Sequence, residues 1–300
     1  MTILLLGAKG QVGQELVKTL EPLDTVAAVD RTQLDLTNLE AIAHTIQHLK
    51  PKVVINAAAY TAVDKAESEP ELAHKINAQA PEAMAKATAD CNATLVHIST
   101  DYVFSGKAGA PRRETDETGP LGVYGKTKLA GEAAIRAATP KHIILRTAWV
   151  YGTQGKGNFL KTMLRLGKER ETLSVVSDQV GSPTWAKDIA DAIADLVKQT
   201  QTADNSDASK LFGTYHFTNS GVASWYDFAI AIFEEVEALG QSLTLKAVKP
   251  IATADYPTPA QRPHYSVLDC QKIAAALKQD PPYWRTSLRN MLKEYLSTPS

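Results

Sequence analysis

Residues 2–13 read TILLLGAKGQVG, and this stretch decides the fold. Its first half is a continuous apolar run, typical of a strand buried on both faces of a parallel sheet. Its second half places Gly7, Gly10 and Gly13 at intervals of three, directly after the strand and where a helical pattern begins. Such glycines permit a tight turn, close approach of the backbone to a pyrophosphate, and close packing of helix on strand. The stretch therefore predicts a strand, a dinucleotide-binding turn and a helix.

Alternating strand and helix patterns continue from this start to about residue 150. The first helix begins at Gln11 and ends before Pro22. The strands and helices predicted after it are Val26–Val29, Leu39–Leu49, Val53–Ile55, Glu71–Ala89 with a restart at Pro81, Thr94–Ile98, Leu121–Ala138 and Ile143–Leu145. This order predicts an α/β protein with a doubly wound parallel sheet of the Rossmann type. Its ligand is expected beyond the carboxyl ends of the strands.

After Trp149 the pattern becomes less regular. The elements predicted there are the helices Phe159–Lys168, Ala186–Lys198 and Trp225–Leu239, the strands Leu173–Val176 and Tyr215–Phe217, two short terminal helices, and a polar surface loop at Thr200–Ser209. We expect residues 1–150 to form the dinucleotide-binding domain. Residues 151–300 are expected to supply the remaining sheet elements and a smaller substrate-binding lobe, with the segments interleaved.

Composition excludes several classes of function. The 300 residues carry 32 Lys and Arg against 33 Asp and Glu, so no positive excess exists for a nucleic acid or an anionic membrane. No run approaches the 18 or so apolar residues of a membrane span. Cys91 and Cys270 provide neither a disulfide framework nor zinc-ligand spacing, and we expect both to be buried thiols in a reducing compartment. The pattern favours a cytoplasmic protein.

Two charged residues, Asp30 and Arg31, lie at the end of the second predicted strand. Asp30 ends that strand, where a carboxylate can bind the adenosine ribose hydroxyls, and the neighbouring Arg31 can pair with a 2′-phosphate. The sequence therefore leaves the choice between NADH and NADPH open. Further on, Asp35 and Leu36 are candidates for the border of an adenine pocket.

A tyrosine and a lysine lie four residues apart in the predicted helix 121–138. Tyr124 and Lys128 therefore share one helix face at the carboxyl edge of the sheet, and Thr100 ends the preceding strand at the same edge. An ammonium beside a phenol stabilises the phenolate, so we expect Lys128 to lower the pKa of Tyr124. The predicted catalytic residues are Tyr124, Lys128 and Thr100. The predicted cofactor contacts are Gly7, Gly10, Gln11, Val12, Gly13, Asp30, Arg31, Asp35, Leu36, Ala57, Ala58, Ala59, Tyr60, Thr61, Ser99, Tyr124 and Lys128.

Longer blocks of sequence resemble a known family. The glycine turn, Asn56-Ala-Ala-Ala, Ser99-Thr-Asp-Tyr-Val-Phe and the Tyr124/Lys128 pair are similar to extended short-chain dehydrogenases/reductases. Four further blocks narrow this resemblance to the dTDP-4-dehydrorhamnose reductases over nearly the whole chain. They begin at Val63, Tyr124, Arg146 and Tyr256 and read VDKAESEP, YGKTKLAGE, RTAWVY and YPTPAQRP.

The resemblance implies reduction of the 4-keto group of dTDP-4-dehydro-L-rhamnose to dTDP-L-rhamnose by NADPH or NADH. It makes Tyr124 the proton donor, Lys128 a nicotinamide-ribose contact and Thr100 the hydroxyl that completes the group. The substrate contacts that it implies are Thr100, Asp101, Tyr102, Trp149 and Arg262. Two alternatives stay open at this point: another sugar-nucleotide reductase or epimerase, and a non-catalytic subunit resembling the regulatory subunit of methionine adenosyltransferase.

Relatives are also associated with Mg²⁺ held by glutamates at a homodimer contact. Glu15 and Glu294 lie in matching stretches, but the middle stretch reads Trp185-Ala-Lys-Asp, and its lysine would repel a cation. We therefore predict no metal site. A homodimer remains among the expectations.

Overall fold

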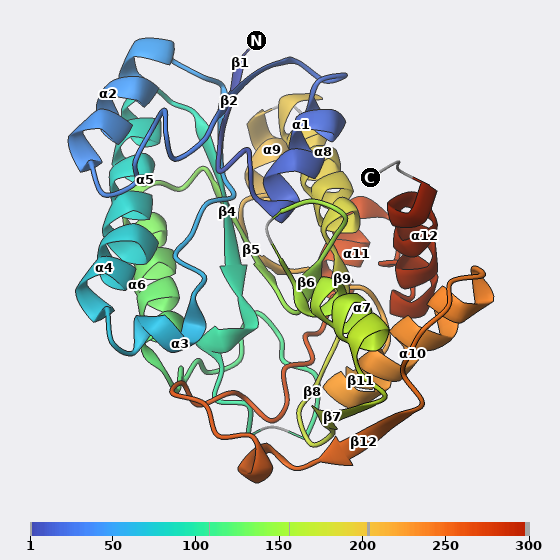
Figure 1. The fold of residues 1–300 in the computed structure, drawn as a ribbon. Helices are drawn as coiled ribbons and strands as arrows, with labels where there is room; N and C mark the ends of the chain where they lie inside the picture. Colours follow the sequence, from blue (N-terminus) through green and yellow to red (C-terminus); the bar gives the residue numbers. More distant parts are fainter. Residues whose placement is uncertain (1, 108, 156, 203–204, 298–300) are drawn as a thin grey trace.

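A six-stranded parallel sheet forms the centre of the molecule (Figure 1). The computed structural model describes residues 2–107, 109–155, 157–202 and 205–297. The strands of this sheet are β1 (Thr2–Leu6), β2 (Thr25–Val29), β3 (Val53–Asn56), β4 (Thr94–Thr100), β5 (His142–Thr147) and β10 (Gly213–His216). Their order is β10-β5-β4-β3-β1-β2, so β2 lies on one side of β1 and the strands from β3 onward lie on the other, with the switch point between β1 and β3. Ligands of such sheets bind at this switch point.

The apolar run at the N-terminus is buried on both faces of the sheet, as predicted. Ile3 and Leu5 belong to the core on one side, whereas Leu4 and Leu6 belong to the core on the other. All four side chains are at most 1 % exposed. Because each such burial contributes roughly 1.5–3 kcal/mol, β1 is a principal stabilising element of the fold.

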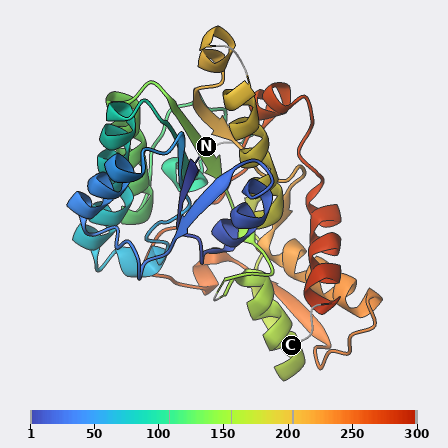
Figure 2. The same ribbon diagram turned by 90° about the horizontal axis from the view of Figure 1, so that it is seen from above.

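Helices cover both faces of the sheet, which confirms the predicted α/β class (Figures 1 and 2). On one side lie α1 (Gln11–Leu20), α8 (Ala186–Thr202) and α11 (Gln271–Leu277), packed through the first core. On the other side lie α2 (Leu39–Leu49), α4 (Pro70–His74), α5 (Ala80–Asp90) and α6 (Val123–Ala138), beside the short α3 (Val63–Ala66).

The second of these layers contains a π-helical turn. Helices α4 and α5 continue into each other through η1 (Lys75–Gln79), and Pro81 lies in the first turn of α5, as predicted. The turn carries the buried Asn77, whose amide accepts a hydrogen bond from Tyr60 N (2.8 Å) and donates one to Tyr60 O (3.1 Å). A π-helical turn holds one residue more than an α-helical turn. Here the turn places Asn77 so that its side chain fixes the backbone that follows β3, and π-turns are often found near functional sites.

A smaller lobe packs around a second, aromatic-rich core. It contains α7 (Phe159–Glu169), α10 (Trp225–Ala238), α12 (Trp284–Ser297), β7 (Thr172–Val176), β12 (Ala247–Ile251) and η3 (Thr253–Asp255). Two pairs of short strands join it to the rest: β6 (Val150–Tyr151) with β9 (Thr184–Trp185), and β8 (Val180–Gly181) with β11 (Ala223–Ser224). The larger part also contains η2 (Asp101–Val103) and α9 (Asn205–Lys210).

The predicted loop at Thr200–Ser209 is wrong where the structure describes it. Helix α8 runs to Thr202 and α9 begins at Asn205, while residues 203 and 204 lie outside the described residues. The segment is polar but has no glycine or proline. Without either of these helix-breaking residues the backbone continues as a helix, within which Thr202 Oγ1 donates to Lys198 O (3.0 Å). Cys91 and Cys270 are only partly buried, less than predicted.

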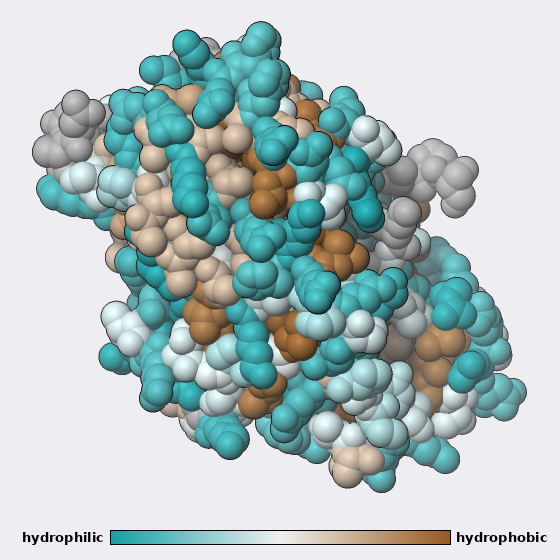
Figure 3. Space-filling view, turned by 90° about the vertical axis from the view of Figure 1, so that its left-hand side faces the viewer, coloured by the Kyte–Doolittle hydropathy of each residue, from teal (hydrophilic) through white to brown (hydrophobic). Residues whose placement is uncertain are grey.

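The outer face of the helix layer that contains α2, α4 and α5 is mainly polar (Figure 3). Hydrophilic residues cover most of it, and the most hydrophobic residues appear as separate spots. Hydrophobic residues exposed singly are normal on a folded protein. Within residues 2–107, 109–155, 157–202 and 205–297, no helix is both long enough and apolar enough to cross a membrane.

Candidate active site

A cavity of about 880 Å³ lies at the carboxyl ends of the central strands. It reaches from the glycine turn after β1 to Tyr124 on α6 and Trp149 after β5. All predicted cofactor contacts except Gly13 line it, as do the predicted substrate contacts except Arg262. The structure thus brings the separately predicted groups into one space. Whether each residue binds a ligand stays a prediction.

The glycine turn leaves the N-terminus of α1 open toward this cavity. No side chain caps the helix and no acidic residue stands in its first turn, so its first N–H groups are available to an anion. Gly7 has φ +85°, and a Cβ there would lie 2.8 Å from Ala58 N. Gly13 does not line the cavity, but a Cβ there would lie 2.0 Å from Gly7 O. Its absence of a side chain lets α1 pack on the turn, and the site fits a dinucleotide pyrophosphate.

We expect a Gly13→Ala variant to bind NADPH roughly tenfold to a hundredfold more weakly, because its methyl group displaces the turn at a strain of about 1–3 kcal/mol. Titration of NADPH followed by fluorescence measures this affinity. Gly109→Ala is the matched control, since a Cβ there has nothing within 4 Å. Unchanged affinity in Gly13→Ala would show that the turn tolerates a side chain.

Asp30 directly follows β2, and its charge is already balanced. Its carboxylate pairs with the exposed Lys9 and accepts hydrogen bonds from Thr32 N (2.7 Å) and Thr32 Oγ1 (2.6 Å). Hydrogen bonding from Lys9, supported by Thr32, holds the pKa of Asp30 well below its ordinary value. Arg31 lies beside it and is 3.8 Å from Asp35. Because Asp30 offers a carboxylate and Arg31 beside it a guanidinium, the pocket can accept a ribose or a 2′-phosphate.

Tyr124 lies deep in the cavity beside Thr100 and Tyr102. Its ring contacts that of Tyr102 edge to face, with centroids 5.4 Å apart. The packing depends on Gly125, where a Cβ would lie 2.2 Å from Tyr102 O. Burial raises the pKa of Tyr124 to about 12, against a hydrogen bond with Thr100 that lowers it, while the charge of Asp101 raises it further. The predicted lowering of this pKa is therefore wrong for the structure described, because desolvation of the phenolate dominates.

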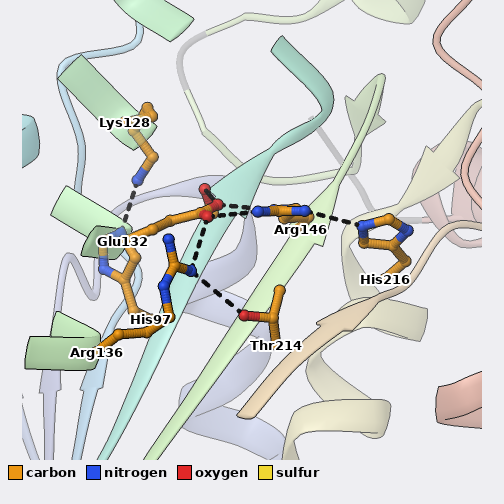
Figure 4. A network of polar contacts seen from close by, with 8 residues as sticks. His97, Lys128, Glu132, Arg136, Arg146, Thr214 and His216 are labelled. Carbon is orange, nitrogen blue, oxygen red and sulfur yellow. Dashed lines mark hydrogen bonds and ion pairs between the residues drawn. The ribbon is translucent and has the colours of Figure 1, made fainter. Parts of the chain in front are cut away.

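Lys128 lies one turn further along α6 and is buried (Figure 4). Its Nζ lies 2.7 Å from Ile98 O and 3.0 Å from His97 Nε2. Burial lowers its pKa to about 8, although the charge of Glu132 acts in the opposite direction. Lys128 therefore faces the end of β4 as well as the cavity that it lines.

One more turn along α6, Glu132 anchors a buried ionic network (Figure 4). Its carboxylate accepts two hydrogen bonds from Arg146, at 2.9 and 2.7 Å, and one from Ser99 Oγ at 2.6 Å. The predicted cofactor contact Ser99 thus donates its hydroxyl hydrogen within the protein. Arg136 lies 3.2 Å from the same carboxylate. The network ties α6 to β4 and β5 and so holds the face that carries Tyr124 and Lys128.

Trp149 projects from a strained backbone into the substrate end of the cavity. Its φ is +50°, an uncommon value that costs a residue with a side chain of order 1–3 kcal/mol. The indole stacks on Trp225, with ring centroids 3.5 Å apart. A Cβ added to Gly181 would lie only 2.6 Å from the Trp149 ring, so the ring packs closely against the backbone of this glycine. The surroundings therefore hold the ring in one orientation, as a ligand platform requires.

Arg262 does not line the cavity, although the resemblance makes it a substrate contact. Its guanidinium binds both carboxylate oxygens of Asp64, at 2.8 and 2.6 Å, and also Ala260 O at 2.7 Å. It ties the C-terminal proline-rich segment to α3, whose first residue Val63 does line the cavity. Its place is thus at the edge of the site.

Sequence reasoning missed part of the lining. Gly155 and Gly157 come after β6 and close one side of the cavity, where Asn158 Nδ2 donates to Gln11 Oε1 (2.7 Å). Glycines at 152, 155 and 157 were the available signal. The other lining residues that were not predicted are Leu6, Lys9, Val29, Leu34, Ala62, Val63, Lys65, Ile76, Ile98, Thr147, Ala148 and Val150.

The acidic residues associated with Mg²⁺ do not fit a metal here. Thr153 Oγ1 lies 3.5 Å from both Glu15 Oε1 and Glu294 Oε1. Burial lowers the pKa of Lys187, but Asp191, Asp188 and Glu15 together raise it, so its ammonium neutralises this region. Among the described side chains, no group of three or more His, Cys, Asp or Glu is placed to hold a metal. No chemistry at this site is assigned to magnesium.

Comparisons with known proteins agree with this geometry. The family model described as the RmlD substrate binding domain matches residues 1–297. The dTDP-4-dehydrorhamnose reductase of Escherichia coli K12 is 45 % identical over 99 % of each chain. The chain belongs to this family. The predicted resemblance is confirmed.

Solved structures of other family members share the whole fold. A dTDP-4-dehydrorhamnose reductase from Clostridium acetobutylicum superposes with a TM-score of 0.90 at 42 % identity, covering 99 % of this chain and all of the other. The Bacillus anthracis enzyme, solved in complex with NADP, gives 0.88 at 36 % identity, covering 98 % and 99 % of the two chains. The Rossmann-type architecture is thus common to the family.

Proposed function

We propose that this protein reduces the 4-keto group of dTDP-4-dehydro-L-rhamnose to dTDP-L-rhamnose with a hydride from NADPH or NADH. The observation that carries the proposal is one cavity that holds both the open N-terminus of α1 and the phenol of Tyr124. Membership of the dTDP-4-dehydrorhamnose reductase family supports the choice of substrate. The NADP complex of the Bacillus anthracis relative supports the choice of cofactor.

The residues divide along the cavity by the part of the cofactor that they would hold. N–H groups at the start of α1 bind the pyrophosphate, and Asp30 with Arg31 bind the adenosine end. Lys128 binds the nicotinamide ribose and so places that ring near Tyr124. When bound, the nicotinamide supplies the hydride. Small side chains at 57–59 let the backbone after β3 lie against the cofactor.

Tyr124 supplies the proton. The hydride forms the new C–H bond at C4, and the phenol O–H protonates the O4 oxygen as negative charge develops there. A pKa raised to about 12 keeps this phenol protonated at neutral pH, which is the form that a donor needs. The Thr100 hydroxyl, hydrogen-bonded with the phenol, stabilises the phenolate that remains.

Asp101, Tyr102 and Trp149 surround the same end of the cavity and would contact the sugar nucleotide. Burial raises the pKa of Asp101 to about 6, against hydrogen bonds with Ser266 and Thr100 that lower it. We assign residues 1–150 to cofactor binding. The segments of 151–300 outside the sheet are assigned to the substrate lobe, with Arg262 holding its edge to α3.

The protein is further proposed to act in the cytoplasm, where nicotinamide cofactors and nucleotide sugars are present. Cys91 and Cys270 are both unpaired, which agrees with a reducing compartment. A homodimer stays a prediction.

The direct test is an assay of purified protein with dTDP-4-dehydro-L-rhamnose and each reduced cofactor. We expect one cofactor oxidised per ketosugar consumed, with dTDP-L-rhamnose identified by mass spectrometry and NMR. A change of sugar configuration without net oxidation would instead identify an epimerase. Tight cofactor binding without oxidation by any ketosugar would favour the regulatory-subunit alternative.

A further inference from the structure

The indole of Trp149 has a second indole directly behind it. Trp225 stacks on it with ring centroids 3.5 Å apart and ring planes 5° from parallel, so the two ring faces are in van der Waals contact. Trp149 lines the cavity, whereas Trp225 lies outside its lining. Trp225 therefore covers the face of Trp149 that is turned away from the ligand space. Phe159 supports Trp225 in turn, at a centroid distance of 4.6 Å.

The position of Trp225 is set by the start of α10. Its N-cap forms a capping box, in which Ser224 Oγ accepts from Asp227 N (3.0 Å) and Asp227 Oδ2 accepts from Ser224 N (2.9 Å). These two hydrogen bonds fix the direction in which the first helical residue, Trp225, leaves the backbone. The preceding strand β11 pairs with β8, which contains Gly181. One paired unit thus supplies both Trp225 behind the Trp149 ring and Gly181 along its edge.

The Trp149 side chain needs such support. Its backbone has φ +50°, a conformation that persists only where the surroundings hold it. Trp149 O accepts a hydrogen bond from Thr184 N (3.1 Å), which fixes the main chain but leaves the side-chain torsions to be set by ring contacts. The cavity of about 880 Å³ in front of the ring offers space into which an unsupported indole can swing. Any such movement loses the contact with Trp225, so the stack favours the observed orientation.

We propose that Trp225 is a positioning residue that holds the Trp149 indole in the orientation that receives the sugar nucleotide. The apparent dissociation constant of a ligand equals its intrinsic value divided by the fraction of protein in the competent conformation. A variant whose indole is correctly placed in about one molecule in ten therefore binds the sugar nucleotide about tenfold more weakly. The proposal rests on the proposed function for the identity of that ligand.

The expected effect is confined to one end of the cavity. The glycine turn and Asp30, which would hold the cofactor, lie away from Trp149 at the start of α1 and after β2. Tyr124 keeps its ring contact with Tyr102. Loss of Trp225 should therefore raise the KM for the ketosugar and leave kcat close to normal. A residue that served only the aromatic core would lower stability without this split.

The binding test compares Trp225→Leu with Trp225→Phe by calorimetric titration of dTDP-L-rhamnose, the product, in the absence of oxidised cofactor. We expect Trp225→Leu to bind it about tenfold more weakly and to bind NADPH within about twofold of wild type. Trp225→Phe should restore most of the affinity, because a phenyl ring can still stack. Tyr226→Leu, at the next residue of α10 and outside the cavity lining, is the matched control and should change neither affinity. Unchanged dTDP-L-rhamnose affinity in a folded Trp225→Leu protein overturns the proposal.

A second test observes the Trp149 ring without any ligand. The chain has four tryptophans, so ¹⁹F NMR of protein labelled with 5-fluorotryptophan can assign the Trp149 signal by its absence in Trp149→Phe. We expect one narrow Trp149 line in wild type and in Trp225→Phe, but a broadened or split line in Trp225→Leu. A single narrow line in Trp225→Leu, whatever its position, contradicts the proposal. Because no substrate is present, this result does not depend on which reaction the protein catalyses.

A Gly181→Ala variant disturbs the same ring while Trp225 stays in place. The added methyl group would lie 2.6 Å from the Trp149 ring, so the indole must shift on the face of Trp225. We expect dTDP-L-rhamnose to bind about tenfold more weakly, with the affinity for NADPH unchanged. Gly109→Ala, where a Cβ has nothing within 4 Å, is the control. Full affinity in a folded Gly181→Ala protein would mean that the orientation of the indole does not matter to the ligand, against the proposal.

Discussion

A Tyr124→Phe variant is expected to lose about 10²–10⁴ of kcat, the usual contribution of a positioned proton donor. Phenylalanine preserves the edge-to-face contact with Tyr102 and removes only the hydroxyl. The affinity for NADPH should stay within about twofold, because the glycine turn, Asp30 and Lys128 are unchanged. Steady-state rates with the ketosugar, together with a fluorescence titration of NADPH, measure the two effects separately.

The matched control is Tyr283→Phe, which removes a hydroxyl from a tyrosine that is 52 % exposed and outside the cavity. It should retain the full rate. Since the pKa of Tyr124 is raised to about 12, the wild-type donor stays protonated well above neutral pH. An undiminished rate in Tyr124→Phe would reject the phenol as the donor and require another acid at C4–O4.

The sequence predicted the parts of the site that depend on local pattern. The turn at Gly7 and Gly10 was recognisable because strand, glycine spacing and helix follow one another within 20 residues. The position of Tyr124 and Lys128 on one helix face follows from helical periodicity alone. Their meeting with Thr100 at one sheet edge follows from parallel topology, since the carboxyl ends of parallel strands lie together.

Effects that depend on burial and on distant partners were not predictable in this way. The spacing of Tyr124 and Lys128 suggested a lowered phenol pKa, but the spacing holds no information on desolvation, which raises it. The π-turn that lets Asn77 hold Tyr60 joins residues 17 apart without a distinctive motif. In the same way, Arg262 was expected at the substrate, whereas its partner Asp64 is 198 residues away in the chain.

A Glu132→Gln variant is expected to lower the free energy of unfolding by about 3–5 kcal/mol. The substitution leaves the guanidinium of Arg146, which is only 3 % exposed, without its countercharge in a site that excludes water. The expected loss exceeds that of a surface ion pair, which is about 0–1 kcal/mol. Urea unfolding at pH 7 measures it. Glu237→Gln, on an exposed position of α10, is the control and should change the free energy by less than about 0.5 kcal/mol.

The difference between wild type and Glu132→Gln should shrink in acid. Burial raises the pKa of Glu132, but the hydrogen bonds and charge of Arg146, with Ser99 and Arg136, hold it below the ordinary value of 4.5. A carboxylate whose pKa is lower in the folded state contributes stability above the unfolded pKa and loses it as pH falls through the folded pKa. The wild type should therefore lose this contribution below pH 4.5, whereas the glutamine has no proton to take up. A difference that stays constant into that range would mean that the Glu132 charge does not stabilise the face carrying Tyr124 and Lys128.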